Sequence, residues 1–195
     1  LYKGGIWRNK EILPLYKNRK DFRGKTVVLG HSDKSINIHD SWVVSQMGAK
    51  NVIGFNYVPN SKISAGIPLG ITNNCDDSER HRILGNESHF LSAERSSKYS
   101  DRFTNSIYLN MTISNNSPER STLFLALKNQ KNVTIQSPKL TNEGRVTYLK
   151  NLRDHNLVPC PAGNGIDTHR IWETLYMGGV PVIRKNRILE SLLVG

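Results

Sequence analysis

Short runs of β-branched residues alternate with stretches of helical pattern along the second half of the chain, and this order restricts the fold more than any other feature. Four runs predict strands, at residues 106–113, 133–135, 157–160 and 180–183. The segments between them predict helices at residues 118–127, at residues 142–153 and from Asp167 onward. Because strands that alternate with helices pair in parallel through right-handed crossovers, we expect an α/β protein with a parallel sheet.

The first half shows the same pattern with fewer elements. It predicts strands at residues 26–30, 51–55 and 63–71. Pro68 places the third strand at a sheet edge, or ends it, because proline cannot donate a hydrogen bond to the ladder. Between the first two strands, Asp40 can cap a short helix that ends at Gly48.

The composition becomes polar over residues 72–105, which predicts a connection between two lobes that carries a helix at residues 88–96. We therefore expect two small Rossmann-like lobes with parallel sheets, formed by residues 1–90 and residues 91–195. The chain stops in "RILESLLVG", where an apolar run has just begun, and we expect a fold of this type to continue.

The net charge of +11 favours an anionic partner, such as nucleic acid, an acidic membrane surface or a phosphorylated metabolite. Apart from a cluster within residues 10–25, the basic residues are dispersed, which is equally typical of a solvated exterior. Aromatic residues lie near this cluster only at Trp7, Tyr16 and Phe22. We therefore do not expect nucleic acid as the partner, although a basic nucleic-acid-binding module is the alternative.

The cysteines and histidines predict neither a disulfide framework nor a metal site. Cys75 and Cys160 are far apart, and neither belongs to a Cys-x-x-Cys pair, so we expect a reducing, cytoplasmic compartment. Cys160 lies in an apolar run, which predicts a buried free thiol. Four Asn-x-Ser/Thr sequons point instead to a lumen such as the Golgi, but such tripeptides arise by chance in an Asn-rich chain. The six histidines are widely separated, and we expect no bound metal.

The densest polar stretch is "GNGIDTHRIWETLYMGGVPVI", residues 163–183. Gly163 and Gly165 allow a sharp turn and a close approach of the backbone to a ligand, because neither has a Cβ atom. Asp167 or Thr168 can cap the helix that follows, whose free N–H groups and dipole attract an anion. The glycines are equally compatible with an ordinary tight loop, since neither a Walker A nor a GxGxxG motif is present.

Helical spacing assigns the next side chains to two faces. Ile171, Trp172 and Leu175 can face the sheet, whereas Arg170, Glu173 and Thr174 share the other face. Arg170 can bind phosphate oxygens with its guanidinium fork, and Glu173 can accept hydrogen bonds from the vicinal hydroxyls of a ribose. These residues therefore predict a nucleotide-diphosphate site, although Arg170 and Glu173 can equally be an i, i+3 surface pair.

The run "PCPAGNGIDTHRIWETLYMGGVPVI" resembles the donor-binding segment of exostosin-like and related GT-B glycosyltransferases, including small forms encoded by viruses and phages. Two further stretches, "YLNMTISNNSPERSTLF" and "KISAGIPLGITN", resemble the same family, so the resemblance extends over residues 26–185. It implies a GT-B-like fold whose C-terminal lobe binds the nucleotide. It also implies an enzyme that moves a hexosyl or pentosyl group from a nucleotide-diphosphate sugar to a glycan or lipid-linked acceptor, in the host cytoplasm if the chain is viral.

The resemblance also implies roles for individual residues. Arg120 and Arg170 would bind the donor diphosphate, and Glu173 would bind its ribose. We expect His169, at the start of the helix, to pack or to contact the donor. The loop that holds the nucleotide would consist of Gly163, Asn164, Gly165, Asp167 and Thr168.

The expected chemistry is a metal-independent transfer without a cofactor. The chain contains no Asp-x-Asp motif for a divalent cation, so the diphosphate charge would meet arginines and a helix N-terminus. An inverting transfer needs a general base, for which Asp33 and His31 are the candidates, in the loop after the first strand. Asp33 can instead be a turn residue and His31 a loop histidine. A catalytically inactive protein that only binds sugar nucleotides is a further alternative.

Overall fold

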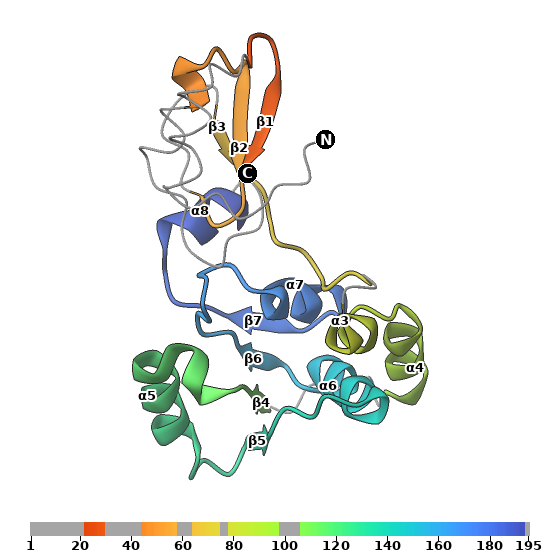
Figure 1. The fold of residues 1–195 in the computed structure, drawn as a ribbon. Coiled ribbons are helices and arrows are strands. Elements are labelled where there is room, and N and C mark those ends of the chain that lie inside the picture. Colours follow the sequence, from red (N-terminus) through yellow and green to blue (C-terminus); the bar gives the residue numbers. More distant parts are fainter. Residues whose placement is uncertain (1–21, 30–43, 58–63, 75–77, 98–105, 194–195) are drawn as a thin grey trace. The chain divides into compact units, whose positions relative to one another are not determined.

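The computed structural model describes residues 22–29, 44–57, 64–74, 78–97 and 106–193, and their contacts form two compact units (Figure 1). The first unit comprises residues 1–69, 163–167 and 185–195, and the second comprises residues 70–162 and 168–184. The division thus falls at Leu69, whereas the sequence predicted it at residue 90. Residues 70–90 belong to the second unit because the helices within the predicted connection, at residues 79–84 and 88–96, pack against another helix of that unit.

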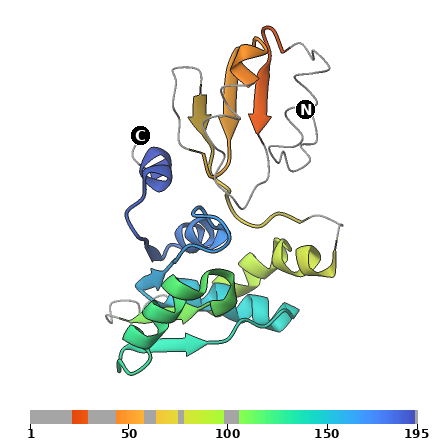
Figure 2. The same ribbon diagram turned by 60° about the vertical axis from the view of Figure 1, so that its left-hand side comes forward.

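The first unit contains a parallel sheet of three strands in the order β1-β2-β3 (Figure 2). The strands are β1 (Thr26–Leu29), β2 (Asn51–Gly54) and β3 (Ser64–Gly66), so all three predicted strands are confirmed. β3 is short and lies at the edge, as Pro68 predicted. Helix α8 (Arg187–Leu193) contacts it.

The core of this unit lies against β2. It consists of Phe22, Val44, Ala49 and Val52, with Val27 and Met47 packed at its margin. The predicted helix is described only at residues 44–46, and Gly48 follows it with a φ of +83°, in the left-handed region that favours glycine. The predicted cap Asp40 lies outside the described residues.

The second unit has the predicted β-α-β-α-β-α-β order, and its four strands are all parallel in the order β5-β4-β6-β7. The strands are β4 (Ile107–Asn110), β5 (Val133–Gln136), β6 (Leu157–Pro159) and β7 (Val180–Val182). The helices are α3 (Glu79–Leu84), α4 (Ser88–Ser96), α5 (Ser117–Leu127), α6 (Asn142–Asp154) and α7 (His169–Tyr176), with a 3₁₀ turn, η2 (Ile113–Asn116), before α5. The predicted α/β architecture with two small Rossmann-like lobes is therefore confirmed.

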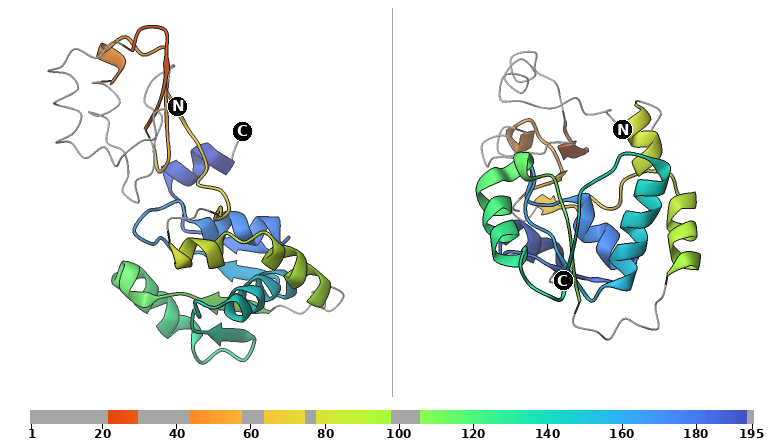
Figure 3. Two further views of the ribbon diagram at one scale, coloured as in Figure 1. Left: turned by 45° about the vertical axis from the view of Figure 1, so that its right-hand side comes forward. Right: turned by 90° about the horizontal axis from the view of Figure 1, so that it is seen from below.

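The helices of this unit cover both faces of the sheet. α5 lies on one face, while α6 and α7 lie on the other and α4 packs on the outer side of α6 (Figures 1 and 3). Across the sheet, β5 is added on one side of β4, and β6 and then β7 are added on the other side. Right-handed crossovers then place α5 on the opposite face from α6 and α7. The direction of winding reverses between β4 and β6, and in doubly wound sheets ligands bind beyond the carboxyl ends of such strands.

Burial in the second unit follows the apolar pattern of its central elements. Tyr108 and Leu109 of β4 and Leu149 and Leu152 of α6 are fully buried. Cys160, directly after β6, is a buried free thiol, as predicted, and its Sγ donates to the carbonyl of Val158. Burial raises the pKa of this thiol to about 11, so it is protonated at neutral pH. Within the described ranges, no helix combines the length and apolar character needed to cross a bilayer.

Two glycines connect α7 to β7, one in a backbone conformation that favours glycine and one with no room for a side chain. Gly178 has a φ of +78°, and a Cβ atom on Gly179 would lie 2.7 Å from the carbonyl oxygen of Leu152 and 2.9 Å from Cγ2 of Thr174. We expect Gly179→Ala to lower the free energy of unfolding by about 1–3 kcal/mol, because the backbone must move to relieve this overlap. Urea denaturation measures the change. Lys131→Ala, at an exposed turn, is the control, and an equal effect of both substitutions would contradict the argument.

Candidate functional site

Arg120 bridges the two loops at the point where the winding of the second unit reverses. Its Nε donates to the carbonyl oxygen of Ala162 at 2.9 Å, and its Nη1 donates to that of Thr112 at 2.6 Å. Thr112 follows β4 and Ala162 follows β6, so the side chain spans the carboxyl ends of the two central strands. Arg120 is buried near the N-terminus of α5, where Asn116 also donates to the carbonyl of Ala162. The arginine that sequence analysis selected thus lies where the topology favours a ligand.

Arg170 lies in the first turn of α7, which follows β6. Its Nε and Nη1 are buried and have no hydrogen-bond partner within the described part of the chain. Its Cζ lies 5.9 Å from the ring centre of Tyr148. Burial alone lowers the pKa of this guanidinium, but Tyr148, Cys160 and Glu173 outweigh that effect and the pKa is raised. Arg170 is therefore a partly buried cation, and two of its buried donor atoms have no acceptor among the described residues.

Arg120 and Arg170 act on one another as like charges. Burial and then the repulsion by Arg170 lower the pKa of Arg120, whose bonds go to carbonyl oxygens. Among the residues that the structure describes, no carboxylate lies within ion-pair distance of either guanidinium. Two neighbouring positive charges that repel one another are costly, and an anion between them would relieve that cost.

Glu173 lies inside the second unit and is part of a closed hydrogen-bond network. Its Oε1 accepts from Arg145 Nη2 at 2.6 Å and from Thr72 Oγ1 at 3.0 Å. Its Oε2 accepts from Arg145 Nη1 at 3.2 Å and from the Tyr148 hydroxyl at 3.0 Å. Burial alone raises the pKa of this carboxyl, but Arg145 more than reverses the effect, so the pKa is lowered and the group is ionised. Glu173 is therefore part of a buried ion pair.

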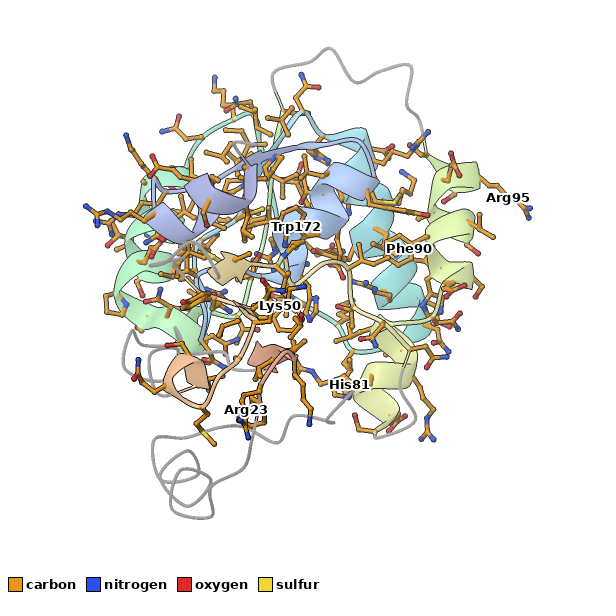
Figure 4. The ribbon with its side chains drawn as sticks, turned by 90° about the horizontal axis from the view of Figure 1, so that it is seen from above. Arg23, Lys50, His81, Phe90, Arg95 and Trp172 are labelled. Carbon is orange, nitrogen blue, oxygen red and sulfur yellow. The ribbon has the colours of Figure 1, made fainter. Side chains whose placement is uncertain are left out.

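Sequence reasoning did not select Arg145 and Tyr148, the two α6 residues that surround Glu173. Arg145 is 3% exposed, and its Cζ lies 5.4 Å from the Phe90 ring centre and 5.3 Å from that of Tyr148. Figure 4 shows Phe90 on the side of α4 that faces α6, whereas Arg95 points outward. A usable signal was present: Arg145 falls on the same helical stripe as Leu149 and Leu152, and an arginine on an apolar stripe indicates a buried partner.

The buried face of α7 differs from the predicted one. Ile171 is buried as expected, but Glu173 and Thr174, assigned to the other face, are also buried, and Leu175 is 44% exposed. The assignment of Leu175 to the sheet was therefore wrong. The physical reason is that α7 packs against α6 as well as against the sheet, and Arg145 supplies the charge that lets Glu173 point inward.

The start of α7 has two polar side chains with different environments. Thr168 is the N-cap residue, but its side chain makes no capping bond, and its Oγ1 is buried without a partner among the described residues. His169 Nδ1 lies 2.8 Å from the carbonyl oxygen of Gly70, so the ring donates to that carbonyl when Nδ1 carries a proton. The contact agrees with the expectation that His169 packs. Its contact with a donor stays a prediction.

The predicted nucleotide loop is divided between the units: residues 163–167 belong to the first unit and Thr168 to the second. Asp167 is buried, its Oδ2 accepts from the backbone N of Leu69 at 2.6 Å, and its own N donates to Asn56 Oδ1 at 2.7 Å. Asp167 thus ties this loop to two other segments of the first unit, and Thr168 is the N-cap of α7. Gly163 N donates to Gly165 O at 2.9 Å, which closes the tight turn that the glycines predicted, and neither glycine has a positive φ. Asn164 is exposed.

The predicted catalytic pair, Asp33 and His31, lies outside the described residues, so its role stays a prediction. In the described ranges, no group of three or more His, Cys, Asp or Glu residues is arranged to hold a metal ion.

Comparison with known proteins connects the second unit to one family. The family model described as the RXYLT1 C-terminal domain matches residues 83–191, which is more than half of the chain. The matched segment contains Arg120, Arg145, Arg170 and Glu173. The family supports a relation to glycosyltransferases. A comparison with curated proteins found no match.

Proposed function

Because this chain belongs to the RXYLT1 C-terminal domain family, we propose that it moves a sugar from a nucleotide-diphosphate sugar to a hydroxyl of a glycan or lipid-linked acceptor. Family membership supports the reaction class. The class of donor, the class of acceptor and the mechanism are proposed here in addition to that reaction class.

The single observation that carries the proposal is that Arg120 and Arg170 repel one another and that neither makes an ion pair with a described residue. Both guanidinium groups belong to the second unit, and Arg120 spans the loops after β4 and β6. The buried Nε and Nη1 of Arg170 have no acceptor among the described residues. Guanidinium forks bind phosphate oxygens with two donors at a time, and α7 begins next to Arg170 with N–H groups that also favour an anion. A donor diphosphate fits this set of groups.

In the proposed step, an acceptor hydroxyl oxygen bonds to the anomeric carbon while the bond from that carbon to the diphosphate oxygen breaks. The leaving diphosphate takes the electron pair of the broken bond, and Arg120 and Arg170 stabilise its charge. A preorganised cationic site of this kind supplies the stabilisation that a divalent cation supplies in other enzymes, so we propose a metal-independent transfer. Asp33 or His31 would take the proton of the acceptor hydroxyl while its oxygen attacks the face of the anomeric carbon opposite the diphosphate, so we propose that the transfer inverts the configuration.

A thermal-shift panel of UDP, GDP, ADP and CMP, with their sugar conjugates, tests the proposal. We expect one nucleoside diphosphate, at about a hundredfold excess over its Kd, to stabilise the chain by about 2.7 kcal/mol. EDTA should leave that shift unchanged if the site needs no metal. An oligonucleotide serves as the comparison ligand. If it stabilises the chain and no diphosphate does, and if its affinity falls steeply as the salt concentration rises, the nucleic-acid-binding alternative is favoured instead.

Catalysis needs a separate measurement, because a sugar-nucleotide-binding protein without activity would give the same thermal shift. We expect release of the nucleoside diphosphate from its sugar conjugate to rise when an acceptor glycan is added. Binding without any acceptor-dependent release across an acceptor panel would leave the binding part of the proposal and remove the transferase part.

A further inference from the structure

We infer that Glu173 is a positioning residue: its carboxylate, fixed by Arg145, orients Tyr148 and through it the Arg170 guanidinium, and it does not contact the ribose of the donor. The inference rests on the proposed function, because it concerns the same diphosphate site. It assigns roles to Arg145 and Tyr148 and changes the role that family resemblance implies for Glu173.

The acceptor capacity of Glu173 is already used within the second unit. An ionised carboxylate offers about four lone-pair positions. Arg145 occupies one on each oxygen, Thr72 takes a second on Oε1, and Tyr148 takes a second on Oε2. The side chain is 4% exposed. A pair of ribose hydroxyls would find no free acceptor here.

Rearrangement to free the carboxylate would be costly. The Arg145 guanidinium lies over the rings of Phe90 and Tyr148, at 5.4 and 5.3 Å from their centres, and the residue is 3% exposed. Two cation–π contacts and two hydrogen bonds to Glu173 hold it in one orientation. If Glu173 turned toward a ligand, Arg145 would be left as a buried charge without a partner.

Tyr148 contacts both Glu173 and Arg170, so the carboxylate that holds Tyr148 in place also limits the position of the Arg170 guanidinium. A phenol has one proton, and Tyr148 donates it to Oε2 of Glu173, so its oxygen can only accept from other groups. Arg170 lies over the same ring, at 5.9 Å from its centre. Burial and the Glu173 carboxylate raise the pKa of Tyr148, which keeps this proton in place at neutral pH. Arg170 is thus held on the Tyr148 side, while its Nε and Nη1 are left for a ligand.

The first test compares the strongest-binding nucleoside diphosphate of the panel with its 2′,3′-dideoxy form, on wild type and on Glu173→Gln. We expect the loss of the two hydroxyls to change the Kd by the same factor in both proteins, because the carboxylate does not touch them. A hydroxyl effect of about tenfold in wild type that vanishes in Glu173→Gln would overturn the inference.

The second test removes the hydrogen bond between Tyr148 and Glu173, which links Glu173 to Arg170, and it removes no charge. We call this link the relay. Tyr148→Phe is expected to weaken diphosphate binding by about three- to tenfold in wild type and to have no further effect in an Arg170→Lys background, since both changes act through one group. Tyr176→Phe, the same change on an exposed tyrosine of α7, is the matched control and should leave the Kd unchanged. Wild-type affinity in Tyr148→Phe, or an equal loss in both backgrounds, would refute the relay. If no nucleoside diphosphate binds wild type, the proposed function itself fails.

Discussion

Replacing Arg170 by alanine is expected to weaken nucleoside diphosphate binding by about a hundredfold or more, because two charge-assisted hydrogen bonds contribute about 3 kcal/mol or more together. The same substitution should change the unfolding free energy of the unliganded protein only a little. Arg170 leaves two buried donors without acceptors among the described residues and repels Arg120, and these costs offset the attraction of Glu173 and the contact with the Tyr148 ring that its removal would lose. Loss of function with retained stability is typical of a residue kept for binding.

Calorimetric titration and urea denaturation of Arg170→Ala measure the two quantities. Arg95→Ala is the matched control, because it removes the same charge from an exposed position on α4 (Figure 4). If Arg95→Ala weakens binding as much, the arginine acts only through the net charge of the chain. A loss of stability as large as that of a core substitution would show instead that Arg170 is structural.

The second large effect concerns the buried ion pair. Arg145→Met is expected to lower the unfolding free energy by about 3–5 kcal/mol at neutral pH, because the Glu173 carboxylate is left buried without its counter-charge. The double variant Arg145→Met/Glu173→Leu should recover most of this loss, since it buries no charge. Arg153→Met is the matched control on the same helix, because its pair with Glu94 is partly exposed and contributes little.

The pH dependence of the Arg145→Met effect has a definite sign. In wild type the folded-state pKa of Glu173 is lowered, so the pair contributes stability above the unfolded pKa of about 4.3, and that contribution is lost as the pH falls. Arg145→Met removes the main cause that lowers this pKa and leaves burial, which raises it, as the largest effect, so acidification protonates Glu173 and relieves the penalty. The difference in unfolding free energy between the two proteins should therefore narrow from pH 7 downward. A difference that does not change with pH would mean that lost packing, and not charge, causes the effect.

Much of the second unit was predictable because its elements are encoded by local patterns. The helix at Ser88–Ser96 and the helix at Ser117–Leu127 were each predicted within one residue. Hydrophobic period and capping residues act over a few positions, so a single sequence displays them. The lobe boundary was displaced because nothing local shows that α4 packs on α6, a contact between segments roughly 50 residues apart.

The sequence alone was enough to predict the order of strands and helices and to select the two arginines of the candidate site. Helical spacing and family resemblance indicated Arg170, and the resemblance indicated Arg120. Only the tertiary structure decided the environment of each group. It placed Arg120 across the loops after β4 and β6, left Arg170 without acceptors, and closed Glu173 into a pair with Arg145 from another helix. The physical reason is that burial and charge compensation depend on neighbours in space, and helical period specifies only which side chains share a face of their own helix.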